Sequence, residues 1–98
     1  MVDEKPITLD TFQPLVGETL RLQLEDHGWE ADLSNLEELP QHRSDAERAP
    51  FTFLLKVQQA GLPQSTYQLT HSGGLEIAVF LVPVAGDATS TTLQAVFN

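Results

Sequence analysis

The chain has 98 residues, with fourteen acidic and five basic side chains, a formal net charge of −9 and no cysteine. This length fits a single domain spanning residues 1–98, and the absence of cysteine excludes disulfides and cysteine-ligated metal sites. The negative charge would repel a nucleic-acid backbone and an anionic membrane surface, so we expect neither as a partner.

Targeting and membrane signals are not recognisable in the sequence. Residues 1–9 alternate charged and apolar side chains and lack the apolar core of a secretory signal. The longest strongly apolar run, Ile77–Val84, is far shorter than the about 20 residues that a membrane helix needs. We therefore expect a cytoplasmic protein by default and leave open its export as part of a larger assembly.

The N-terminal region predicts at most one short helical turn, near residues 10–16. Asp10-Thr11-Phe12-Gln13 could cap such a turn, but Pro14 and Gly17 prevent a longer helix. From Leu20 onward, apolar and polar residues alternate with a period of two over most of the chain. Such alternation is typical of strands with one buried face, so we expect the rest of the domain to be β-sheet.

Two strands joined by a turn are predicted first. Residues 20–25 alternate as one strand, and the turn at 26–28 leads into a second strand that starts at Trp29. The alternation slips by one residue near Ser34-Asn35, where the extra residue of a β-bulge would restore it. Pro40 ends this second strand.

The middle of the chain predicts a polar loop followed by two more strands. Residues 40–50 contain no apolar residue larger than alanine, which indicates an exposed, flexible loop. Residues 51–58 alternate as a third strand, residues 60–64 are typical of a turn, and residues 67–71 alternate as a fourth strand. Ser72-Gly73-Gly74 then predicts a tight connection into the next strand.

The segment Leu75–Val84 is apolar on both faces. Its two alternating sets are Leu75, Ile77, Val79 and Leu81 on one face, and Ala78, Phe80 and Val82 on the other. We expect this strand to be covered on both sides or to lie at the centre of a sheet. A turn at 85–90 precedes a last strand at 93–97. The predicted fold class is therefore all-β, with six or seven antiparallel strands in sequential hairpins that form a small barrel or a two-layer sandwich.

Catalytic motifs are missing from the sequence, so we predict no enzymatic activity and no cofactor. There is no glycine-rich phosphate-binding loop. Ser72, His71 and Asp87 supply the residue types of a hydrolase triad, but His71 and Ser72 are neighbours and would point in opposite directions on a strand. A hydrolase or isomerase that uses histidine and carboxylates is the least favoured alternative.

Metal binding is not predicted either. The acidic and histidine side chains near the first turn match neither a calcium loop nor a helical histidine pair, so we interpret them as a solvated hairpin tip: Glu25, Asp26, His27, Glu30 and Asp32. His42 falls in the polar loop, and His71 is interpreted as a residue at the end of a strand.

Two features of the sequence are candidates for protein contact. The negative charge is concentrated between residues 25 and 48, where Glu37 and Glu38 belong either to a docking patch for a basic partner or, as we favour, to a solubilising face. The second feature is a set of apolar residues that would form an exposed stripe if nothing covers them: Trp29, Leu54, Phe80 and Val82. In a closed barrel or sandwich we favour burial of this set in a second core layer.

Six segments together resemble a family of small bacterial β-domains without an assigned function. They are Ile7–Phe12, Leu15–Gly17, Ala49–Phe51, Leu62–His71, Leu75–Val84 and Ala95–Asn98. Members of that family are often encoded beside proteins similar to phage tail-collar or microcystin-dependent proteins, which implies an accessory or structural part in a tail-like or surface-fibre assembly. The polar loop at 42–47 is longer here than in the family, and the resemblance implies no active site.

We therefore expect a non-enzymatic domain that binds another, unidentified protein through edge strands or the acidic face. The alternative is a barrel that binds a small molecule or a carbohydrate, with Trp29, Tyr67 and Phe80 lining its pocket. A homo-oligomer formed by strand pairing is left open, although the like charge of two copies opposes it.

Overall fold

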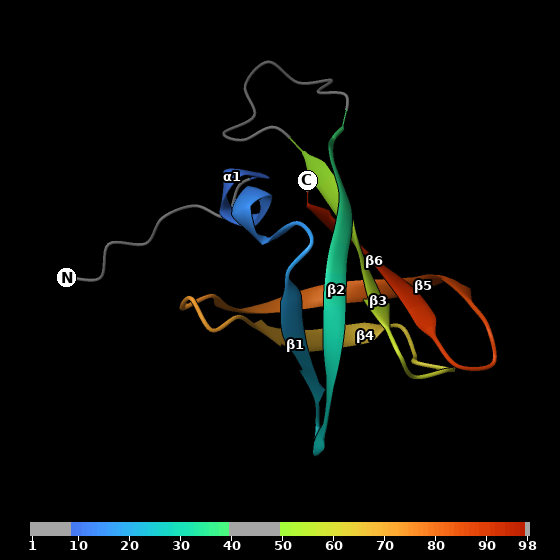
Figure 1. Ribbon diagram of the computed structural model, residues 1–98. Helices are drawn as coiled ribbons and strands as arrows, with labels where there is room; N and C mark the ends of the chain where they lie inside the picture. Colours follow the sequence, from blue (N-terminus) through green and yellow to red (C-terminus); the bar gives the residue numbers. More distant parts are fainter. Residues whose placement is uncertain (1–8, 40–49, 98) are drawn as a thin grey trace.

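The computed structural model describes residues 9–39 and 50–97, which form a six-stranded β-barrel (Figure 1). Its elements are α1 (Leu9–Phe12), the 3-10 helix η1 (Gln13–Leu15), β1 (Thr19–Leu24), β2 (His27–Glu38), β3 (Phe51–Val57), β4 (Ser65–Thr70), β5 (Glu76–Gly86) and β6 (Thr91–Phe97). All strand pairs are antiparallel, in the order β1-β2-β3-β6-β5-β4, and β1 also pairs with β4 to close the barrel. The prediction of an all-β fold is confirmed, and the architecture is a barrel.

One connection departs from the sequential hairpins that we predicted. β4 lies between β1 and β5 rather than beside β3, so residues 58–64 carry the chain across the end of the barrel. The resulting spatial order 4-1-2-3 is that of a Greek key. Alternation identifies strands but does not say which strands pair, and this explains the difference. Closure also leaves no strand of the described barrel with a wholly unpaired side, so the open edge needed for a strand-pairing dimer is not present there.

The barrel interior is filled by the inward-facing residues of all six strands. These residues are the ones that the period of two predicts: Leu20, Leu22, Ala31, Leu33, Phe51, Phe53, Leu55, Val57, Tyr67, Leu69, Val79, Leu81, Leu93 and Ala95, all buried. A small barrel is just wide enough for side chains to fill its interior. The inner face of the sheet is thus a packed core.

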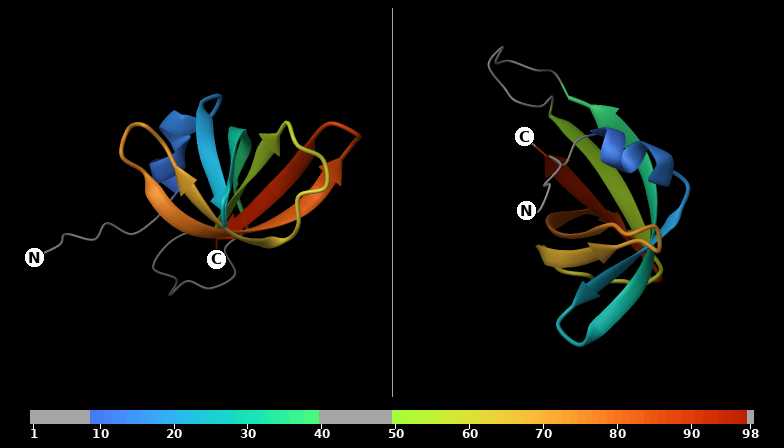
Figure 2. Two further views of the ribbon diagram at one scale, coloured as in Figure 1. Left: turned by 90° about the horizontal axis from the view of Figure 1, so that it is seen from below. Right: turned by 90° about the vertical axis from the view of Figure 1, so that its left-hand side faces the viewer.

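The short helix at one end of the barrel closes that end (Figures 1 and 2). Phe12 from α1 is completely buried and packs at ring-centroid distances of 5.8 Å from Phe51, 4.6 Å from Phe53 and 5.6 Å from Phe97. Pro14 follows within η1 and stops the helix after one turn, as predicted. The helical turn is therefore short but carries an essential part of the core.

The crossing segment, residues 58–64, packs a buried leucine, Leu62, against the same core. The Thr91 hydroxyl holds this segment, because it donates to the Gln59 carbonyl at 2.7 Å and accepts from the Leu62 amide at 3.3 Å. The Tyr67 hydroxyl donates to the Pro63 carbonyl at 2.6 Å, and burial raises the pKa of Tyr67 above its ordinary value. Three hydrogen bonds thus fix the connection that creates the Greek key.

The β-bulge predicted near Ser34-Asn35 is confirmed. The pairing of β2 with β3 shifts between Ser34 and Glu37, and Asn35 has a positive φ of 52°. Asparagine is one of the few non-glycine residues that adopt this left-handed conformation readily. The bulge keeps the apolar residues of β2 on the inner face on both sides of the irregularity.

Of the two alternatives for this strand, β5 lies inside the sheet between β4 and β6, but it is not covered on both faces. Val79 and Leu81 are buried in the barrel, but Phe80 and Val84 on the other side are 52% and 51% exposed. In a single-layered barrel every strand has only one inner face, and no described residue lies over the outer face of β5. The second layer of core that we favoured for Phe80 and Val82 does not exist in the described part of the protein.

Asp87 organises the turn between β5 and β6, and its hydrogen bonds should make the stability of the fold depend on pH. Its Oδ1 accepts hydrogen bonds from the backbone amides of Thr89 and Ser90, both at 2.8 Å, and from their hydroxyls. These bonds, that from the Thr89 amide first, lower the pKa of Asp87 below its ordinary value of 3.8. A lowered pKa stabilises the folded state above the ordinary pKa, and this contribution is lost as the pH falls through the folded-state value.

Asp87→Asn is therefore expected to be less stable than the wild type at pH 7. The difference should persist down to about pH 4 and shrink below it, as the wild-type carboxylate takes up its proton. Urea unfolding of both proteins at several pH values between 7 and 2 measures this. A difference that stays constant over the whole range would contradict the role given to the ionised carboxylate.

Two further predictions concern the polar loop and membrane-spanning segments. Most of the predicted polar loop at 40–50, with His42, lies outside the described residues. No helix in the described part of the chain is long and apolar enough to cross a membrane.

Candidate interaction surface

The outer face of β3, β6 and β5 carries an apolar surface that we call the outer patch. It consists of Leu54, Phe80, Val82, Val84 and Val96. Phe80, Val84 and Val96 are each about half exposed, at 52%, 51% and 49%, whereas Leu54 and Val82 are partly buried. Clustered exposed apolar residues on a protein surface are typical of interaction sites.

Strand register brings the members of the outer patch together. On one side of β6, Val96 lies opposite Thr52 of β3. On the other side, Ala95 lies opposite Leu81 of β5, so continuing this register by one residue places Val96 beside Phe80. Directly paired residues of neighbouring strands share one face of the sheet, with Cβ atoms about 5 Å apart. The patch is therefore continuous across β6 and β5.

A second row of the same face joins β3 to the patch. Gln94 of β6 lies opposite both Leu54 of β3 and Val82 of β5, so one polar side chain separates two apolar ones. Residues that are far apart in the sequence thus form one surface because β6 is inserted between β3 and β5.

Charged residues border the outer patch on three sides. Glu37 of β2 lies opposite Thr52 of β3, which in turn lies opposite Val96 of β6, so the three residues form one cross-strand row. Glu37 and Glu38, at the end of β2, are both exposed. Glu76 begins the outer face of β5, in phase with Phe80. Lys56 lies on the remaining side, opposite Asp32 in one direction and Thr92 in the other.

The predicted interface residues are thus only partly brought together. Leu54, Phe80 and Val82 lie in the outer patch, and Glu37 borders it. Glu38 lies opposite the inward-facing Phe51, so it belongs to the other phase of the strand. Trp29 does not belong to the patch.

Trp29 is partly buried and packs against the core. It stacks on His27 at 5.9 Å and meets the edge of Tyr67 at 6.4 Å between ring centroids. It does not join an exposed stripe with Phe80, which was the less favoured alternative, because it follows the inner phase of β2 with the buried Ala31 and Leu33. Its place near the β1–β2 turn leaves it half covered.

The pocket expected between Trp29, Tyr67 and Phe80 is also not formed. Tyr67 is completely buried inside the barrel, whereas Phe80 is exposed outside it. Tyr67 pairs with Val79 and Thr66 pairs with Phe80, so the two aromatic residues lie on opposite faces of the same two strands. They cannot line one cavity.

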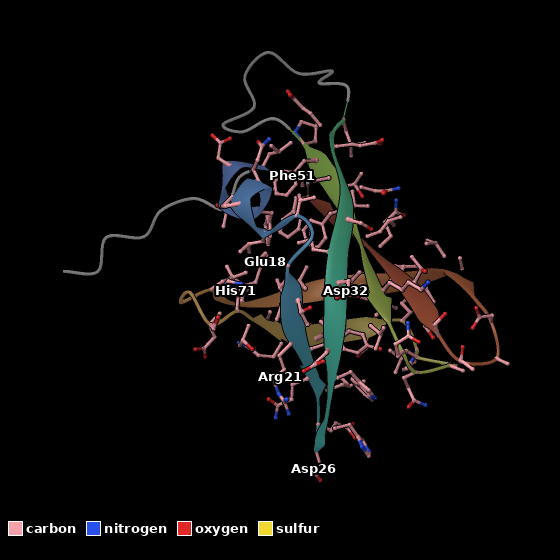
Figure 3. All side chains as sticks on the ribbon, in the orientation of Figure 1. Glu18, Arg21, Asp26, Asp32, Phe51 and His71 are labelled. Atoms are coloured by element: carbon pink, nitrogen blue, oxygen red, sulfur yellow. The ribbon has the colours of Figure 1, made fainter. Side chains whose placement is uncertain are left out.

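The histidine and carboxylate side chains considered for catalysis are engaged in structural contacts. His71 Nδ1 accepts a hydrogen bond from the Gly73 amide at 3.0 Å, and His71 Nε2 lies 3.6 Å from Glu18 Oε1 (Figure 3). Asp87 lies beyond the far end of β5 and binds its own turn. The triad residues His71 and Ser72 are therefore separated from Asp87 by the whole length of β5.

A shallow surface depression of about 380 Å³ lies beside His71. It is lined by residues of β1, β2 and the end of β4 with the two residues that follow it: Thr19, Leu20, Arg21, Glu30, Thr70, His71 and Ser72. Among the residues that the structure describes, no three histidine or acidic side chains are grouped closely enough to hold a metal ion.

Two members of the outer patch, Val84 and Val96, were missed from the sequence. Val84 continues the spacing of Phe80 and Val82, and Val96 is an apolar residue out of phase with Leu93, Ala95 and Phe97. For Val96 this spacing is a sufficient signal for facing outward, whereas Val84 lies at the register shift between Pro83 and Ala85, where strict alternation stops. The spacing could not show that β6 lies between β3 and β5, which is what brings these residues together.

Comparison with known proteins identifies one family. A family model described as Domain of unknown function (DUF6916) matches residues 7–97. No curated protein and no solved structure matches the chain.

Proposed function

Since the chain belongs to the family Domain of unknown function (DUF6916), whose description names no activity, we propose from its own surface that it is a non-enzymatic protein-interaction domain. The observation that carries this proposal is the outer patch. Three of its five apolar side chains are about half exposed on a barrel whose interior is already filled. Exposed aromatic residues such as Phe80 are enriched at protein interfaces, where they act as anchors.

A phage-tail-like or surface assembly of bacteria is the setting that we propose for this interaction. The support is the resemblance to small β-domains that are often encoded beside proteins similar to tail-collar proteins. A barrel with an exposed apolar outer patch suits an accessory part of such an assembly, because a preorganised surface loses little conformational entropy on binding.

Binding of this chain to the products of the genes that flank its own tests the proposal. We expect one of them to bind the wild type and to bind Phe80→Ser about tenfold or more weakly, since an anchor residue contributes roughly 2 kcal/mol or more. Val96→Thr is expected to weaken binding as well. Isothermal titration calorimetry with the purified proteins gives the dissociation constants.

Val16→Thr is the matched control. Val16 is 47% exposed, close to the 49% of Val96, but it lies in the turn between η1 and β1. It should leave the affinity unchanged. Equal binding by all three variants, or an equal loss for Val16→Thr and Val96→Thr, would contradict the assignment of the function to the outer patch.

A further inference from the structure

We infer that the partner of the outer patch is a protein surface with an apolar centre surrounded by basic side chains. This inference rests on the proposed function and adds the chemistry of the partner. It follows from the charges that border the patch and from the charge of the whole chain.

The first step is the sign of the border. Glu37 lies in the same cross-strand row as Thr52 and Val96, and Glu76 lies on β5 in phase with Phe80. Both carboxylates are exposed, so long basic side chains of a partner could reach them while its apolar centre covers Phe80 and Val96. The border is thus complementary to a positively charged rim.

The second step concerns the scarcity of positive charge. Within residues 9–39 and 50–97, the basic residues are Arg21 and Lys56, and of these only Lys56 borders the outer patch. Lys56 lies opposite Asp32 in the register of β2 and β3, so an acidic residue is its cross-strand neighbour. A partner with an acidic rim would therefore meet repulsion on two sides of the patch.

The third step excludes a second copy as the preferred occupant. Each copy carries a formal charge of −9, so two copies approaching through faces bordered by Glu37 and Glu76 would repel each other. A basic partner gains from the same field, which speeds its approach and orients it. Charge thus selects a different, basic protein.

Selection from a random peptide library displayed on a surface tests this inference. The immobilised full-length wild type and its Phe80→Ser variant are each used as bait, and the enriched peptides are sequenced. We expect the peptides that only the wild type enriches to carry apolar residues flanked by lysine or arginine.

The two other outcomes separate the inference from the proposed function. Peptides that need Phe80 but are neutral or acidic would overturn the inference and leave the outer patch as an interaction site. Enrichment of the same peptides by both baits would overturn the proposed function together with the inference. Thermal unfolding of Phe80→Ser checks that the variant is folded. Val96→Thr serves as a second bait of the same kind.

The affinity of one selected peptide for charge variants gives an independent readout. Glu37→Gln is expected to weaken binding by up to about fivefold, the range of one exposed ion pair, and added salt should weaken the wild-type complex. Asp26→Asn removes the same charge at the β1–β2 tip, away from the patch (Figure 3), and should have little effect. An equal loss for both variants would show that only net charge matters and would overturn the specific role of the border.

Discussion

Phe12→Ala is expected to lower the free energy of unfolding by about 3–5 kcal/mol, the range for removing a fully buried phenylalanine ring. The ring of Phe12 is completely buried and contacts the rings of Phe51, Phe53 and Phe97. The four residues of α1 are too few to form a stable helix alone, so core packing, to which Phe12 contributes together with Leu9 and Leu15, holds the turn in place. Urea unfolding monitored by circular dichroism measures the loss.

Phe12→Leu provides the comparison for this prediction. Leucine keeps most of the apolar volume, so its loss of stability should be clearly smaller than that of alanine. A loss below about 1 kcal/mol for Phe12→Ala would mean that the helical turn does not close the barrel, since a surface substitution costs no more than roughly that amount.

Thr91→Val is expected to lower the free energy of unfolding by about 1–3 kcal/mol, although valine has nearly the same shape. The change removes the hydroxyl that binds Gln59 and Leu62, and it leaves the Leu62 amide without its acceptor. Thr91 is only 3% exposed, so water cannot easily replace the lost bonds. The segment that crosses the barrel should also exchange its amide hydrogens faster.

Thr91→Ser separates the hydroxyl from the methyl group, because it keeps the hydrogen bonds and removes only apolar volume. Its amide exchange over residues 58–64 should stay close to that of the wild type. If serine and valine accelerated exchange in this segment equally, the hydroxyl would not be what holds the crossing connection.

Local patterns predicted the strands well because each strand of a single-layered barrel has one buried and one exposed face. The alternation at Leu20 and Leu22 and the slip at Ser34-Asn35 both report which side of the chain meets the core, and this is a local property. The closing pair of β1 with β4 and the crossing of residues 58–64 depend on contacts between distant segments. Such contacts have no period in the sequence.

For the outer patch, too, local features could be predicted and features that depend on distant contacts could not. The outward phase of Leu54, Phe80 and Val82 could be predicted, but whether another layer covers them could not. Apolar residues on both sides of β5 indicate burial in a layered protein and an interface in a barrel, and the choice depends on the complete topology. The sequence likewise places Phe12 in a helical turn, but its burial in the core depends on how that turn folds over the end of the barrel.

Methyl NMR spectroscopy of the full chain tests most directly whether the outer patch, rather than the barrel interior, carries the function. During a titration with the flanking gene product that binds the chain, the methyl signals of Leu54, Val82 and Val96 are expected to shift or broaden. The signals of the interior residues Leu33 and Leu69 should change little, because both are buried in a filled core. Changes confined to these interior methyl groups, or to the surroundings of His71, would contradict the account.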